Sequence, residues 1–166
     1  MLDKFDTSQL TNEDYTKLYD KLTRFTNWWF THHDHSKTGY AAYYHIDESG
    51  YDESTLFDKG LPLHAPDLQA YVVMLCEACS RLATLIGKPE RAAHWMSEST
   101  RVFTYLVDVL WDGEQFRSKL LTTGEHIKCG SIAQLQPAML GRRLPKVISL
   151  LCVHSPEGPW LLQRNF

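Results

Sequence analysis

Two long stretches with a helical apolar period, separated only by Gly87 and Lys88, constrain the fold of this chain more than any other feature. The first stretch follows Pro66, and its apolar residues recur every three or four positions, as on one face of a helix. Proline suits the first turn of a helix and glycine suits the position just beyond the last turn. The second stretch runs from Pro89 to about Trp111. Two helices joined by so short a turn form an αα-hairpin, so we expect an all-α fold of long, hairpin-paired helices.

Residues 11–32 are expected to form a further helix. Thr11 and Asp14 have the spacing of a capping box, with aspartate in place of glutamate, and acidic residues suit the first turn. Apolar residues then follow at spacings of three and four up to Trp29, the pattern of one helix face.

The second half of the chain shows weaker signals. Thr123 and Gly124 form a turn signal between residues 115–121 and 125–129, which predicts a possible short β-hairpin. Residues 131–139 and 144–153 are expected to form two shorter helices, the second starting at Pro145.

Length and charge narrow the classes of function. The 166 residues suffice for one domain with a core, and the net charge of −3, without a long basic cluster, argues against a nucleic-acid partner. We find no apolar run close to the ~18 residues that a membrane span requires, so no membrane partner is expected. The polar N-terminus shows no secretory signal, which favours a cytoplasmic location.

Cys76 and Cys79 have the spacing of a redox or zinc pair. They lie in a strongly helical apolar segment and no second close pair follows, so we expect them to pack in the core. A metal or redox role is the alternative.

Residues 33–65 form a long irregular stretch, and loops of this length in compact domains are usually functional. At its centre, residues 47–54 place four carboxylates within seven positions around Gly50, where glycine permits backbone angles that other residues avoid. Aromatic rings can stack on sugar faces while carboxylates handle protons and hydroxyls. The stretch therefore suggests a sugar site, and the aromatic residues around it are Trp28, Trp29, Phe30, Tyr40, Tyr43, Tyr44 and Tyr51.

Three functions compete for this region. The first is a metal site, since zinc takes three or four histidine and carboxylate ligands. Neighbouring loop residues rarely converge on one ion, so we predict neither a metal nor a cofactor. A calcium ion held by loop oxygens is the alternative, although no calcium-loop pattern is present. The second is glycoside hydrolysis by a general acid, for which Asp52 fits, beside Glu48 and Glu53. The third is a module that binds carbohydrate or a partner without catalysis.

Three motifs carry a resemblance to a known family. They are Asn27-Trp28-Trp29 with His33-Asp34-His35 and Gly39, then Glu48-Ser49-Gly50-Tyr51-Asp52, then Pro66-Asp67-Leu68. In this order they resemble glycoside hydrolase family 63, whose relatives include trehalases, mannosylglycerate hydrolases and bacterial glycogen-debranching-like proteins. Trp111-Asp112-Gly113, Phe116, Pro137 and Leu140-Gly141 extend the similarity over about residues 13–153.

The resemblance implies an (α/α)6 toroid that hydrolyses an α-glucoside or a related oligosaccharide with inversion. It assigns the general acid to Asp52 and the lining of the sugar subsite to Glu48, Gly50 and Tyr51, with Trp29 and Asp34 close by. Two positions depart from the family pattern. Tyr51 stands where tryptophan is usual, which keeps an aromatic ring and adds a hydroxyl. His33 stands where arginine is common, which removes a permanently charged, bidentate guanidinium.

The same resemblance implies that the chain is partial. The toroid has twelve helices, of which this sequence supplies about four or five, and Glu125 and Glu157 do not match the family's general-base motif. We therefore expect residues 1–153 to be a partial catalytic domain, inactive alone, and residues 154–166 to be an irregular tail from truncation or a frameshift. A non-catalytic carbohydrate-binding or interaction module and an inactive remnant are the alternatives. Uncovered helix faces, such as those bearing Trp95 and Phe103, predict self-association.

Overall fold

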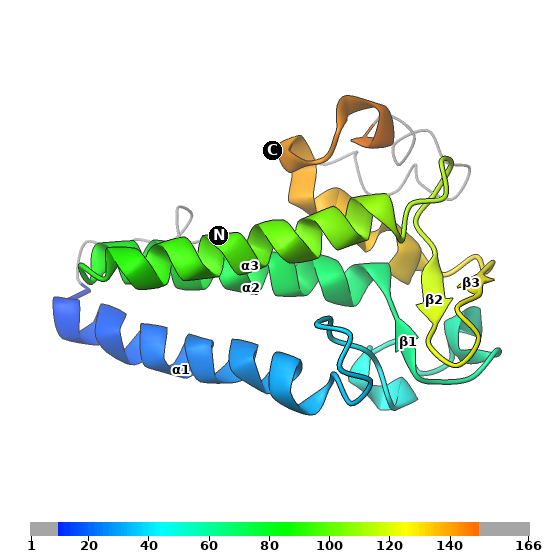
Figure 1. Ribbon diagram of the computed structural model, residues 1–166, viewed down its shortest axis with the longest axis horizontal. Helices are drawn as coiled ribbons and strands as arrows, with labels where there is room; N and C mark the ends of the chain where they lie inside the picture. The colour runs from blue at the N-terminus through cyan, green and yellow to red at the C-terminus, as the bar shows by residue number, and fades with distance from the viewer. Residues whose placement is uncertain (1–9, 150–166) are drawn as a thin grey trace.

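The structure, a computed structural model, describes residues 10–149. Three long helices dominate it: α1 (Asn12–His32), α2 (Pro66–Leu85) and α3 (Pro89–Asp108). They run side by side, each antiparallel to the preceding one, and loops and short elements gather at one end (Figure 1). The predicted helical fold with a hairpin of long helices is confirmed.

The ends of these helices follow the predicted capping signals. Thr11 caps α1 through a capping box, in which its hydroxyl accepts from the Asp14 N–H at 3.2 Å and Asp14 accepts from the Thr11 N–H at 2.9 Å. After α2, Gly87 has a φ of +72°, and the N–H groups of Gly87 and Lys88 donate to the carbonyls of Thr84 and Ala83. These two bonds form a Schellman motif, which ends α2 and lets α3 begin two residues later.

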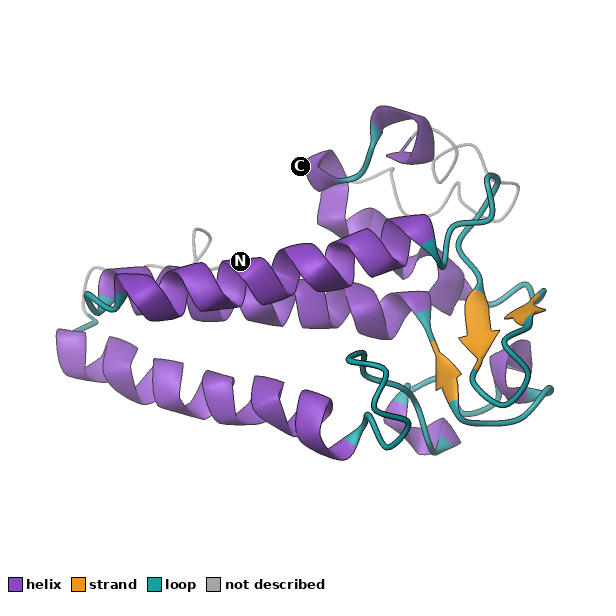
Figure 2. Ribbon diagram, viewed as in Figure 1, coloured by secondary structure: helices purple, strands orange, loops and turns teal. Residues whose placement is uncertain are grey.

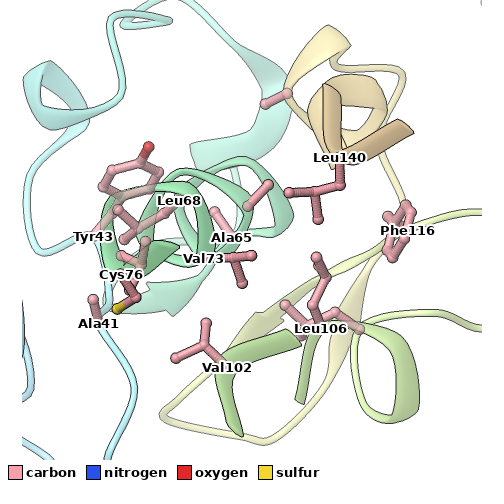
Figure 3. Packing of buried hydrophobic residues seen from close by; sticks show 14 of the residues in the cluster. Ala41, Tyr43, Ala65, Leu68, Val73, Cys76, Val102, Leu106, Phe116 and Leu140 are labelled. Atoms are coloured by element: carbon pink, nitrogen blue, oxygen red, sulfur yellow. The ribbon is translucent and has the colours of Figure 1, made fainter. Parts of the chain in front are cut away.

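Helix α2 contributes more buried hydrophobic residues to the core than α1 or α3 does, because it packs against both of them and against residues 132–143. Figure 3 shows Val73 of α2 opposite Val102 and Leu106 of α3. Cys76 and Cys79 are fully buried on α2, and burial raises the pKa of Cys76 to about 12, so their predicted core position is confirmed.

A three-stranded antiparallel sheet lies beside the loops at the end of the helices (Figure 2). Its order is β1 (Leu63–His64), β2 (Ser118–Leu120) and β3 (His126–Ile127). The predicted hairpin is confirmed, with β2 and β3 paired in the register Ser118 to Ile127. Strand β1 was not predicted, because two residues are too short to show an alternating pattern.

Three 3₁₀ segments complete the fold: η2 (Ile46–Glu48), η3 (Thr55–Phe57) and η4 (Ile132–Arg143). The expected helix over 131–139 is η4, which contains Pro137 and a break at Gly141, where φ is +55°. Proline removes a hydrogen-bond donor and disfavours a regular α-helix. Of the expected helix 144–153, residues 146–149 are helical, while residues 150–153 and the expected tail 154–166 lie outside the described residues.

Two surface expectations need correction. Trp95 is only 4% exposed, because its indole donates to the Tyr19 hydroxyl of α1 at 3.3 Å, so it does not lie on an uncovered face. Helix α2 is long and apolar enough, by length and composition, to cross a membrane, contrary to the expectation that no run comes close. More than half of its most apolar window (56%) is buried inside the protein, as in the core helix of a soluble protein.

Replacement of Gly87 tests the turn between α2 and α3. A Cβ at this position would contact nothing within 4 Å, so Gly87→Ala adds only the backbone cost of a positive φ. We expect the free energy of unfolding in urea to fall by about 1–2 kcal/mol with an unchanged m-value. Gly87→Asn, which tolerates this conformation, is the control and should lose less; an equal loss in both variants would contradict the assignment.

Candidate functional site

The loop from residue 33 to residue 58 is fastened to the start of α2 by two buried hydrogen bonds. The Tyr43 hydroxyl donates to Asp67 Oδ2 at 2.9 Å, and the Gln69 amide donates to the Ala41 carbonyl at 2.7 Å. Burial raises the pKa of Asp67 to about 6, although hydrogen bonds from Tyr43 and from first-turn backbone N–H groups oppose that rise. These contacts fix the middle of the loop against the core.

Helix α3 holds the beginning of the loop. Arg101 donates to the Gly39 carbonyl at 2.7 Å, and its guanidinium lies 4.9 Å from the centre of the Tyr40 ring. A Cβ on Gly39 would come within 3.0 Å of that guanidinium, and its φ is +86°. Tyr40 in turn stacks on Tyr105, whose hydroxyl lies 2.5 Å from His64 Nδ1. Burial lowers the pKa of His64 to about 4, so this histidine is neutral at pH 7.

Asp34 shapes the loop through its own hydrogen bonds. It accepts from the backbone N–H groups of Thr38 and Gly39, each at 2.7 Å, and from the Thr38 hydroxyl at 2.9 Å. Both carboxylate oxygens are therefore used within the turn. Asp34 lines neither of the two hollows described below, where a sugar contact was predicted.

Glu48 is held in place by two donors. Its Oε1 lies 2.9 Å from His33 Nε2, and its Oε2 accepts from the Tyr44 N–H at 2.8 Å. Partial burial alone would raise the pKa of Glu48, but these hydrogen bonds hold it below its usual value. Trp28 and Trp29 flank the His33 ring, at centroid distances of 4.3 and 4.7 Å. Glu48 is ionised and already takes part in two hydrogen bonds. Such a carboxylate can accept a hydrogen bond from a sugar hydroxyl but is a poor proton donor.

The first hollow is a groove of about 640 Å³ between α1, α2 and η4. Trp29 and Glu48 line one part of it, together with Tyr43 and Tyr71. Most of its remaining lining is aliphatic, from Leu18 and Leu22 of α1, Leu68, Val72, Leu75 and Leu82 of α2, and Met139 and Leu140 of η4.

The second hollow is an open cleft of about 550 Å³ that contains Asp52. Residues 50–55 form one wall, and Gly130, Ser131 and Ile132 form the other. The structure therefore brings Gly50, Tyr51 and Asp52 together and separates them from Trp29 and Glu48. Asp52 is exposed, and within residues 10–149 its carboxyl forms no hydrogen bond; Glu53 lines the same cleft, whereas Glu48 lines the groove.

Two residues that hold the acidic loop, Ser131 of the opposite wall and Gln136 beyond it, were missed by sequence reasoning. The Gln136 amide donates to the Tyr51 hydroxyl at 2.6 Å, and the Ser54 hydroxyl donates to Ser131 at 2.8 Å. They hold the acidic loop on both sides of Asp52. The available signal was weak: Gln136 is a polar residue between Leu135 and Pro137.

The structure gives no support to a metal centre in the part that it describes. Among residues 10–149, no three histidine, cysteine or carboxylate side chains are grouped as an ion would require. His33 is engaged with Glu48, and His35 packs on Tyr44 at 4.4 Å.

A comparison with protein families identifies the kind of domain. The family model of the mannosylglycerate hydrolase MGH1-like glycoside hydrolase domain matches residues 3–155. The chain belongs to this family. No curated protein and no solved structure matches the chain. The resemblance to glycoside hydrolase family 63 drawn from the three motifs is thus confirmed, and the acidic loop is part of a glycoside hydrolase-like domain.

A double-mutant cycle tests how Gln136 holds Tyr51. Each of Tyr51→Phe and Gln136→Leu leaves one partner unpaired, whereas the double variant removes both polar groups. We expect a coupling of about 1 kcal/mol in the free energy of unfolding, measured in urea. Tyr51→Phe combined with Gln134→Leu is the control, because Gln134 bonds Ile127 and Cys129 instead and should show no coupling.

Asp67→Asn tests the buried carboxyl at the start of α2. Because its pKa is raised from 3.8 to about 6 on folding, the folded chain binds the proton more tightly. The stabilisation is complete below about pH 4 and is lost as pH rises through 6. We expect the stability of the wild type relative to the variant to fall by about 3 kcal/mol over this window. Asp58→Asn, at an exposed site, is the control, and a flat difference for Asp67→Asn would overturn the assignment.

Proposed function

We propose that this domain carries the acid half of an inverting α-glycoside hydrolase site, with Asp52 as the general acid and an α-glucoside or related oligosaccharide as the substrate. Family membership supports the reaction class. The observation that carries the proposal is the cleft, in which exposed Asp52 belongs to the wall formed by residues 50–55, across from Gly130, Ser131 and Ile132. The helical hairpin and α1 are, in this proposal, part of an (α/α)6 toroid.

Each loop residue has a role in this proposal. Asp52 gives its proton to the leaving oxygen of the glycosidic bond, which becomes a hydroxyl as the carbon–oxygen bond breaks. The Tyr51 ring forms a wall for the sugar, and Gly50, at a φ of +70°, makes the turn that aims both residues into the cleft. Glu48 and Trp29 contact the substrate only where it extends from the cleft into the groove.

An inverting reaction also needs a base that activates water, roughly 6.5–9.5 Å from the acid. Among residues 10–149, the acidic residues that line the cleft are Asp52 and its neighbour Glu53, and the opposite wall has none. We therefore propose that the 166-residue chain alone hydrolyses α-glucosides very slowly or not at all.

Passive carbohydrate binding is the second candidate. The exposure of Asp52 favours it, since a general acid is usually kept protonated by burial or by neighbouring negative charge.

Self-association is expected at the groove, where Leu18, Phe25 and Met139 expose 38–50% of their surface, and not at the face that bears Trp95.

Asp52→Asn separates the two candidates. We expect no hydrolysis of trehalose or maltose above background by the purified chain, and saturable binding of one of these sugars or of glucose by calorimetry. An acid that acts only in catalysis changes binding little, so Asp52→Asn should retain the affinity, whereas a ligand contact should be lost. Tyr51→Ala is expected to weaken binding by roughly tenfold through the lost aromatic contact.

Two results would contradict the proposal. Hydrolysis by the wild-type chain that disappears in Asp52→Asn would show that the chain holds a complete site. The absence of binding to every sugar tested would indicate an inactive remnant.

A further inference from the structure

A third hollow lies between α1 and α3, near the turn that joins α2 to α3, since Lys88 of that turn lines it. It is a cleft of about 340 Å³. Tyr19 and Asn27 line it from α1, and Lys88, Arg91, His94 and Trp95 line it from the start of α3. None of these residues contributes to the cleft that contains Asp52 or to the groove.

The lining of this cleft is rich in cations and has no carboxylate. Lys88, Arg91 and His94 are spaced three residues apart, so they lie along one side of the first turns of α3. Among residues 10–149, neither Lys88 nor Arg91 forms an ion pair, and Glu98, the carboxylate one turn beyond His94, is bonded to Arg101. The positive end of the α3 dipole lies at the same place. Lys88 and Arg91, three residues apart, repel each other, and an anion bound between them would relieve that repulsion.

The floor of the cleft is aromatic and buried. Tyr19 and Trp95 are 7% and 4% exposed, and the Trp95 indole donates to the Tyr19 hydroxyl at 3.3 Å. Because that hydroxyl accepts from Trp95, its own proton is available to a ligand. The Lys88 ammonium lies over the Tyr19 ring, 5.4 Å from its centre, so a positive charge stands over the floor of the cleft.

We propose that this cleft binds a phosphate-type oxyanion, either free phosphate or the phosphate group of a small molecule. A guanidinium binds two phosphate oxygens at once, and an ammonium supplies a second positive charge. The Asn27 amide on the opposite wall and the Tyr19 hydroxyl on the floor provide neutral donors. The volume admits a phosphate together with a small group attached to it.

The test is a titration with inorganic phosphate at constant ionic strength, with sodium chloride as the balancing salt. The readout is the indole N–H signal of Trp95 in a ¹⁵N-resolved NMR spectrum, assigned with Trp95→Phe. We expect that signal to move saturably with phosphate while the signal of exposed Trp28 stays in place. Arg91→Gln and Lys88→Gln are each expected to weaken binding roughly tenfold, as for a lost hydrogen bond to a charged group.

Arg142→Gln, at an exposed arginine far from the cleft in sequence, is the matched control and should bind phosphate as the wild type does. Glucose 6-phosphate and glucose distinguish the two sources of the anion. Tighter binding of the ester than of phosphate identifies a phosphorylated small molecule, and equal binding identifies free phosphate. The proposal is overturned if phosphate gives no saturable shift, or if Arg142→Gln weakens binding as much as Arg91→Gln. The outcome is independent of the sugar cleft, since the two sites share no residue.

Discussion

The hydrogen bond from Tyr43 to Asp67 is the contact on which the rest of the structure depends. It joins the loop of residues 33–58 to the first turn of α2, the central helix of the core. A buried carboxylate is costly unless its oxygens are paired, and here Oδ2 accepts from the Tyr43 phenol while Oδ1 has no hydrogen-bond partner among the described residues. The loop can therefore be long and irregular over residues 33–58 and still hold one position against the helices.

Much of the fold could be predicted from the sequence, because helices are coded locally. The period of α1, α2 and α3, the capping box at Thr11 and the turn at Gly87 each lie within a few neighbouring residues. Strand β1 and the 3₁₀ geometry of η4 could not be predicted in this way. Leu63 and His64 become a strand only because β2, more than fifty residues later, pairs with them. Pro137 signalled an irregularity in η4 but not its type.

The candidate site was predictable to a smaller degree. The acidic stretch and Asp52 follow from composition and from the family motif, yet adjacent residues of that stretch enter different hollows. Ser49 lines the groove and Gly50 lines the cleft, because the chain turns at Gly50, where φ is +70°, just after η2 ends. Ser131 and Gln136 form hydrogen bonds with loop residues that lie 77 and 85 positions earlier in the chain. No local sequence pattern predicts contacts over such separations.

The contact between Gln136 and Tyr51 has a consequence for the entropy of binding. With the phenol hydroxyl bonded and the Tyr51 N–H bonded to Ser49 at 2.9 Å, both ends of this residue are restrained before any ligand arrives. Ordering a free side chain costs about 0.5–1.5 kcal/mol on association. A tyrosine in place of tryptophan, with a glutamine to hold it, therefore gives the cleft a wall whose ordering cost has already been met during folding.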